Sequence, residues 1–260
     1  MVSETGEPHT RSVDVLHILA KHHQALSSED IRTLLAFISA AKPGDLSDGE
    51  WEERVNVILN ALRAQDLYVP GLTDYLLTTA GKHPSRILRL YAMQHLALWY
   101  QREPSEGKRR EIVALLEKLA EKAGEETAGS AVMFLNDLQR EAAATGGEVV
   151  KDEVIGRAAL RLAADRGAKQ DVRISALHTC VERKMPAVLP AARQIAADTS
   201  AVIPLRKAAI FSIGQLGTAE DQAMLDKLGA DVPDLRPATV PALTTLRAQP
   251  GGAISESPGR

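Results

Sequence analysis

The stretch Asp171-Val172-Arg173-Ile174-Ser175-Ala176-Leu177 recurs, with substitutions, at three other places in this chain. The recurrences are Pro204-Leu205-Arg206-Lys207-Ala208-Ala209-Ile210, Asp234-Leu235-Arg236-Pro237-Ala238-Thr239-Val240 and Leu88-Arg89-Leu90-Tyr91-Ala92-Met93. Each contains an arginine, a small residue three positions later, and then an apolar residue. The arginines at 173, 206 and 236 lie 33 and 30 residues apart. Self-similarity at this period is typical of repeat proteins, in which each unit buries its apolar face against its neighbours.

Apolar residues follow the spacing i, i+3, i+4, i+7, which indicates helices with one buried stripe. Period-two alternation is nearly absent, and aromatic residues make up only 3% of the 260 residues. The sequence therefore predicts an all-α protein of antiparallel helix pairs. First helices are expected at about 68–81, 108–122, 151–165, 186–197 and 219–229, and second helices at about 84–101, 126–144, 170–183, 202–216 and 235–248.

The motif resembles the HEAT-repeat family, including its short bacterial variety, in which a first helix ends near an aspartate and a second opens with Val-Arg-x-x-Ala. The best match runs from Val188 through Asp198 and then from Val202 through Gly217. The resemblance covers about residues 68–248. It implies a right-handed α-α superhelix, an armadillo-like solenoid of about five helix pairs. It does not specify a ligand, because one fold supports many functions.

We expect four parts along the chain. Residues 1–11 are predicted to be disordered, and residues 12–66 to form a helical cap or degenerate repeat, with helices near 12–24, 28–41 and 49–64. Residues 67–248 form the repeat array, and the Gly-, Ser- and Pro-containing tail 249–260 is expected to be disordered. Ser47 and Glu50 predict a capping box at the start of the helix at 49–64.

Composition argues against several functional classes. The formal charge is -3 with acids and bases interspersed, so no basic field favours nucleic acid as a partner. No apolar run approaches the roughly 18 to 20 residues that span a bilayer, and residues 1–10 lack the apolar core of a signal peptide. The single cysteine, Cys180, excludes an internal disulfide. We expect no membrane partner and a cytoplasmic location, with a removed leader as the alternative.

Six residues predict a structural ladder between repeats: Asp171, Arg173, Asp198, Arg206, Asp234 and Arg236. In this hypothesis each arginine pairs with an aspartate from an inter-helix turn of its own or an adjacent repeat. The aspartate lies two residues before the arginine at Asp171 and Asp234, but it is displaced at Asp198. The alternative is that the arginines contact an anionic partner.

The second helices generally line the concave face of HEAT-like stacks, so the resemblance places a ligand on their polar sides. Candidate binding residues are Tyr91, His95, His178 and Glu182. His178 and Glu182 share a helix face at i and i+4, but two ligands do not make a metal site. Tyr91 and His95 lie in an aromatic-rich segment, 68–100, which is either an interface anchor or filling for a wider core.

No catalytic or cofactor motif is apparent, because the chain has no phosphate-binding glycine loop and no nucleophile elbow. The stretch from Asp45 to Glu50 resembles a calcium loop but has Asn56 where the bidentate acid is required. We therefore predict a non-enzymatic scaffold, without cofactor or metal, that binds a protein or peptide through its concave face. The alternatives are a HEAT-like DNA glycosylase, which would need a basic face, and a PBS-lyase-like chromophore attachment factor. Partner identity and oligomeric state stay open.

Overall fold

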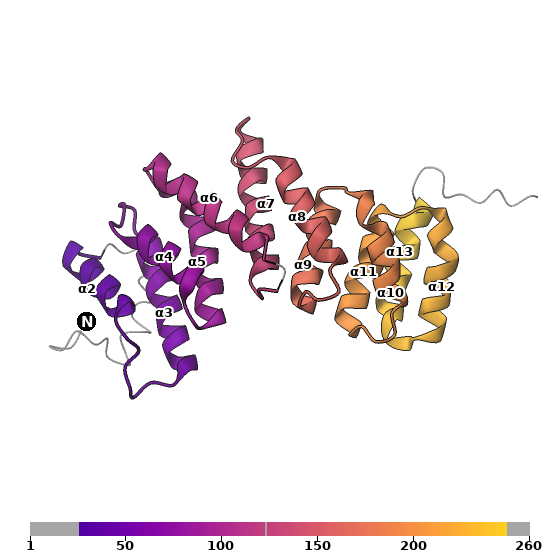
Figure 1. Cartoon of the computed structure of the whole chain (residues 1–260), viewed down its shortest axis with the longest axis horizontal. Coiled ribbons are helices and arrows are strands. Elements are labelled where there is room, and N and C mark those ends of the chain that lie inside the picture. Colours follow the sequence, from indigo (N-terminus) through magenta and orange to yellow (C-terminus); the bar gives the residue numbers. More distant parts are fainter. Residues whose placement is uncertain (1–25, 123, 249–260) are drawn as a thin grey trace, which may run out of the picture. The chain divides into compact units, whose positions relative to one another are not determined.

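The structure is a computed structural model that describes residues 26–122 and 124–248 (Figure 1). These residues form α-helices and short 3-10 helices and no strand. The all-α fold class predicted from the sequence is therefore confirmed. The predicted helix at 12–24 and the predicted disordered ends, residues 1–11 and 249–260, lie outside the described residues.

The chain divides into two compact units, one that ends at Leu116 and one that begins at Glu117. Helix α6, Glu106–Ala120, carries the chain from the first unit into the second. The boundary expected at residues 66 and 67, between a helical cap or degenerate repeat and the repeat array, stays a prediction. Helix α3 packs on α5, so the helices before residue 67 share a core with the pair that follows them.

The first unit contains α2 (Ser28–Ser39), α3 (Asp48–Arg63), α4 (Leu72–Lys82), α5 (Arg86–Trp99) and the 3-10 helix η1 (Tyr100–Arg102). Serine side chains begin three of these helices, because a hydroxyl oxygen satisfies a backbone N–H that the first turn leaves unpaired. Ser47 accepts the Glu50 N–H, and Glu50 accepts the Ser47 N–H at 2.9 Å. The predicted capping box is confirmed.

The second unit alternates two kinds of helix. Its first helices are α8 (Asp152–Ala164), α10 (Leu189–Ala197) and α12 (Gln222–Asp231), and 3-10 turns η2 (Pro186–Val188) and η3 (Ala219–Asp221) precede the last two. Its second helices are α7 (Ala128–Ala144), α9 (Gln170–Glu182), α11 (Ile203–Leu216) and α13 (Arg236–Ala248), the last preceded by η4 (Pro233–Leu235). The second helices pack on one another in chain order, and each of the three first helices packs against the second helix after it. Within this unit, the arrangement is compatible with a solenoid.

Two glycines allow the second helices to meet backbone to backbone. A Cβ built on Gly214 of α11 would lie 2.7 Å from the Cα of Ala242 in α13. A Cβ on Gly129 of α7 would lie 2.8 Å from the Cα of Val172 in α9. Contacts this short do not occur between real side chains and backbone, so the helix spacing at both crossings depends on glycine.

Two motif arginines, Arg173 and Arg206, contact the main chain and not the predicted aspartates. Arg206 is buried, and its Nε–H donates to the carbonyl of Ala196 at 3.0 Å. Arg173 donates in the same way to Ala163 at 3.2 Å, and both partners lie ten residues before the arginine. These carbonyls belong to the last turns of α8 and α10. A carbonyl there has no N–H of its own helix to accept, and it lies at the negative end of the helix dipole.

The predicted aspartate pairing is therefore wrong for Arg173, Arg206 and Arg236. Within 26–122 and 124–248, none of these three guanidinium groups forms an ion pair. Arg236 is exposed, as is Asp234, and its side chain makes no hydrogen bond to a described residue. Arg173 does lie close enough to two carboxylates to be affected: burial lowers its pKa, and Asp165 and Asp198 oppose that shift.

The aspartates have a separate role in the connectors. Asp198 ends α10 and accepts the Ser200 N–H at 2.9 Å. Asp165 ends α8 and accepts the Gly167 N–H at 2.8 Å. Both lie eight residues before the motif arginine, so Asp165 is the true counterpart of Asp198. Asp171, which the sequence alignment placed in that role, belongs to the first turn of α9.

Candidate functional site

One position on each second helix of the second unit is exposed in every repeat. It lies two residues after the small residue of the motif, and that small residue is buried each time. The buried residues are Ala176, Ala209 and Thr239, together with Ala131 of α7, which keeps the same register although α7 lacks the motif arginine. The exposed positions are Met133, His178, Phe211 and Pro241, which we call the exposed row. The row runs from α7 through α9 and α11 to α13, across helices that pack side by side.

The exposed row is largely apolar. Met133 is 41% exposed and Phe211 is 42% exposed, although most side chains of this size are buried. The His178 ring stacks on the Phe211 ring with centroids 5.6 Å apart, so these two side chains join α9 to α11. Large apolar side chains that are exposed at equivalent positions of successive repeats mark a surface suited to a partner.

Polar side chains beside the exposed row form hydrogen bonds and ion pairs with one another. Asn136 donates to Glu182 at 2.6 Å, which links α7 to α9. Arg140 donates to Asp137 at 2.7 Å and lies 3.8 Å from Glu182. One positive group, Arg140, therefore lies near two negative groups beside the row, and the row itself is neutral at Met133 and Phe211.

The four candidate binding residues from the sequence fall in two different units. His178 and Glu182 are both exposed on α9, one in the row and one beside it. Tyr91 is half-buried on α5 in the first unit. His95, also on α5, is only 3% exposed, so its predicted place on an accessible binding face is wrong. The physical reason is its helical register, because His95 lies between the buried stripe positions Ala92 and Trp99.

The surroundings of His95 are those of a core residue. Its Nε2 lies 3.3 Å from the Asn56 side-chain oxygen, and its Nδ1 is buried without a partner among the described residues. Burial, and secondarily the positive charge of Arg63, lowers the pKa of His95 to about 4. The imidazole is consequently neutral at ordinary pH.

The part of the chain that the structure describes has neither a cluster of candidate metal ligands nor a helix that could span a membrane. Three or more His, Cys, Asp or Glu side chains do not gather there in a way that could hold a metal ion. None of the helices in 26–122 and 124–248 is both long and apolar enough to cross a membrane. Cys180 is buried, and burial raises the pKa of its thiol to about 12. A thiol with such a pKa is a poor nucleophile.

Sequence reasoning missed Met133 and Phe211. The signal was present, because both follow the small motif residue by two positions, as His178 does. Extending the motif alignment by two residues would have grouped the three. Comparison with models of known protein families, and with curated proteins, finds no match for this chain.

Proposed function

We propose that the chain is a non-enzymatic, HEAT-like repeat scaffold that binds a protein or peptide segment along the exposed row. The observation that carries this proposal is the repetition of one exposed, largely apolar position, at Met133, His178 and Phe211. A residue that only packs the repeat is buried, as Ala131, Ala176 and Ala209 are. The stack between His178 and Phe211 covers these side chains only in part, and large apolar groups that stay exposed at equivalent positions favour contact with a partner.

The spacing of the row suits an extended peptide. Packed helices lie about 8–10 Å apart, so neighbouring row positions differ by about that distance. A polyproline II segment rises about 3.1 Å per residue with three residues per turn, which brings the same face back about every 9 Å. A peptide with an apolar residue at every third position would therefore meet α7, α9 and α11 in turn.

Selection from a displayed library of random linear peptides tests the proposal. Peptides are selected on the wild-type protein and depleted on a Met133→Ser/Phe211→Ser variant. We expect the recovered sequences to share apolar residues three positions apart. In a direct titration of a recovered peptide, Phe211→Ser should weaken binding at least about tenfold, as for an interface anchor residue.

Val202→Ser is the matched control, because Val202 is 40% exposed but lies at the start of α11, outside the row. It should leave peptide affinity unchanged. Equal losses in the two variants, or recovered peptides without apolar periodicity, would contradict the proposed use of the row.

A further inference from the structure

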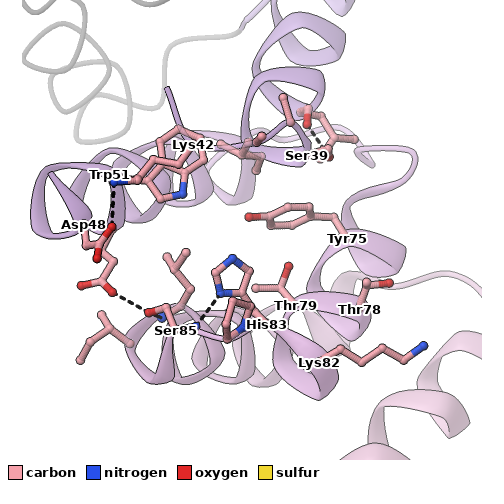
Figure 2. A pocket seen from close by; sticks show the side chains of 18 of the residues that line it. Ser39, Lys42, Asp48, Trp51, Tyr75, Thr78, Thr79, Lys82, His83 and Ser85 are labelled. Atoms are coloured by element: carbon pink, nitrogen blue, oxygen red, sulfur yellow. Dashed lines mark hydrogen bonds and ion pairs between the residues drawn. The ribbon is translucent and has the colours of Figure 1, made fainter. Parts of the chain in front are cut away.

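A cavity of about 1110 Å³ lies within the first unit, with α2 and α3 on one side and α4 and the start of α5 on the other (Figure 2). Sites that hold drug-sized molecules measure about 300–1,000 Å³, so the cavity is large enough for such a ligand. Leu35 and Ile38 from α2 and Leu88 from α5 supply apolar lining. A small organic molecule would therefore meet apolar groups on both sides.

Contacts between helices hold the walls of the cavity in place. The Ser85 hydroxyl donates to Glu52 at 2.5 Å, which ties the start of α5 to α3, and Ser85 accepts the Leu88 N–H as the cap of α5. Phe37 of α2 packs edge-on against the Trp51 ring of α3, with centroids 5.3 Å apart. Walls held in this way lose little conformational entropy when a ligand binds.

The indole N–H of Trp51 is a buried hydrogen-bond donor that the protein leaves open. Trp51 is only 5% exposed, and its N–H points into the cavity without a hydrogen-bond partner among residues 26–122 and 124–248 (Figure 2). Because the described part of the chain supplies no acceptor, this N–H is satisfied only by a molecule that enters the cavity. Trp51 therefore marks the place of an acceptor atom.

Two further rings direct donors into the same cavity, Tyr75 of α4 and His83 at the C-cap of α4 (Figure 2). The Nδ1 of His83 accepts the Ser85 N–H at 3.0 Å, so the proton of the neutral ring is on Nε2, which faces the cavity. Burial raises the pKa of Tyr75, with a smaller opposing effect from Thr79, so the phenol keeps its proton and can donate. A ligand that satisfies these groups carries acceptor oxygens.

The charged side chains of the lining offer no unmatched charge to a ligand. The acidic ones all have partners, which are Lys42 for Asp48 at 2.8 Å, Lys108 for Asp74 at 2.7 Å and the Ser85 hydroxyl for Glu52 at 2.5 Å. Of the basic ones, Lys42 is thus paired, Arg86 is also engaged, and the exposed Lys82 ammonium is directed away from the three rings (Figure 2). An ion that entered would lose hydration without gaining an opposite charge, so the cavity favours an uncharged ligand.

We propose that this cavity binds an uncharged, planar aromatic molecule with acceptor oxygens, such as an aromatic ketone or lactone. Its rings lie against the apolar lining, and its oxygen atoms accept hydrogen bonds from Trp51, Tyr75 and His83. A mostly apolar site with a few converging polar groups is the usual design of a small-molecule site, because the apolar area supplies affinity and the polar groups fix orientation. This ligand site is independent of the exposed row, which lies in the other unit.

Three fluorescent probes with the same ring system test the proposal. Prodan is a dimethylaminonaphthalene that carries an uncharged propionyl ketone, dimethylaminonaphthalene itself lacks the carbonyl oxygen, and the corresponding dimethylaminonaphthalene sulfonate is anionic. We expect prodan to bind the full chain at one site with a Kd below about 100 μM. The other two probes should bind more weakly, one because it has no acceptor oxygen and the other because its charge is unmatched.

The ratio of prodan affinity to dimethylaminonaphthalene affinity isolates the hydrogen bonds from the shape of the cavity. Tyr75→Phe removes one donor and keeps the ring, so this ratio should fall about two- to tenfold. Trp51→Phe removes the indole N–H and should lower the ratio by a similar factor, with circular dichroism confirming that the variant is folded. Tyr100→Phe is the matched control, because Tyr100 is half-buried but does not line the cavity, and it should leave the ratio unchanged.

Phe211→Ser separates this site from the exposed row, because it should weaken peptide binding to the row and leave prodan bound. Failure of prodan to bind at a single site, or sulfonate binding as tight as that of prodan, would overturn the proposal. An affinity ratio that stays the same in Tyr75→Phe and Trp51→Phe, or that falls equally in Tyr100→Phe, would also overturn it.

Discussion

Asp165 and Asp198 occupy the same place in successive repeats, each as the residue that ends a first helix and accepts an N–H from two residues later in the connector. Because each carboxylate is engaged in its own turn, the arginine eight residues later bonds to a backbone carbonyl. The repeat therefore contains two separate sets of hydrogen bonds, one from the aspartate to its own turn and one from the arginine to the end of the preceding helix. They can be tested separately.

The motif arginine should contribute to the free energy of unfolding only where its side chain is buried. Arg206→Ala removes the donor to the Ala196 carbonyl and leaves that acceptor buried, so the free energy of unfolding should fall by about 1–3 kcal/mol. Arg236→Ala is the control, because Arg236 has the same motif position but an exposed side chain, and it should change stability by less than about 0.5 kcal/mol. Urea unfolding measures both. Similar losses in the two variants would show that the carbonyl contact is not the cause.

Replacement of a helix-contact glycine by alanine should be tolerated only where the neighbouring atoms belong to a side chain that can move. Gly214→Ala directs its Cβ at the backbone of α13, so it should destabilise by about 1–3 kcal/mol, as for overpacking. Gly156→Ala places its Cβ 2.8 Å from the terminal methyl of Met185, whose flexible side chain can move away. Thermal unfolding should therefore show a clear loss for Gly214→Ala and a much smaller change for Gly156→Ala. The reverse order would contradict the close helix approach at Gly214.

His95 should make stability depend on pH. The unfolded chain takes up a proton near the ordinary histidine pKa of about 6.5, whereas the folded protein resists protonation of His95 until about pH 4. Its contribution to the free energy of unfolding is thus constant above about pH 6.5 and falls as the pH drops toward 4, by at most about 3 kcal/mol. His95→Gln, which retains hydrogen-bonding capacity but does not titrate, should lack this part of the acid dependence in urea unfolding measured from pH 7 to 4. Parallel curves for the two proteins would rule out His95 as the titrating group.

The Arg193–Asp221 pair should be the most consequential ion pair in the second unit. It is bidentate, at 2.6 and 3.0 Å, and Asp221 also accepts the Thr218 N–H. Burial raises the pKa of Asp221, but Arg193 and the Thr218 N–H outweigh that effect, so the pKa is lowered. Asp221→Ala should therefore cost roughly 2–4 kcal/mol, since it leaves Arg193 without its carboxylate and breaks the capping box that Asp221 forms with Thr218 at the start of η3. Arg140→Ala, which breaks an exposed pair, should cost at most about 1 kcal/mol in the same chemical unfolding experiment.

Helix positions could be predicted well, because a stripe of period 3.6 depends only on local sequence and burial. The predicted second helix at 202–216 differs by one residue from α11, and the predicted 170–183 differs from α9 by one residue at its end. The partners of the arginines could not be predicted, because a backbone carbonyl has no residue type by which a pattern can identify it. The cavity lined by Trp51, Tyr75 and His83 was equally hidden, since Trp51 lies on α3 and the other two lie on α4 and at its C-cap, with no common spacing.

The contact between Arg206 and a main-chain oxygen also bears on how such repeats change over generations. Every amino acid carries the same carbonyl, so a substitution at Ala196 that preserves the helix leaves the acceptor in place. Selection therefore acts on one side of the contact only, and the arginine need not covary with any second position. Paralogous units can diverge throughout their turns and first helices while keeping the same helix-to-helix junction.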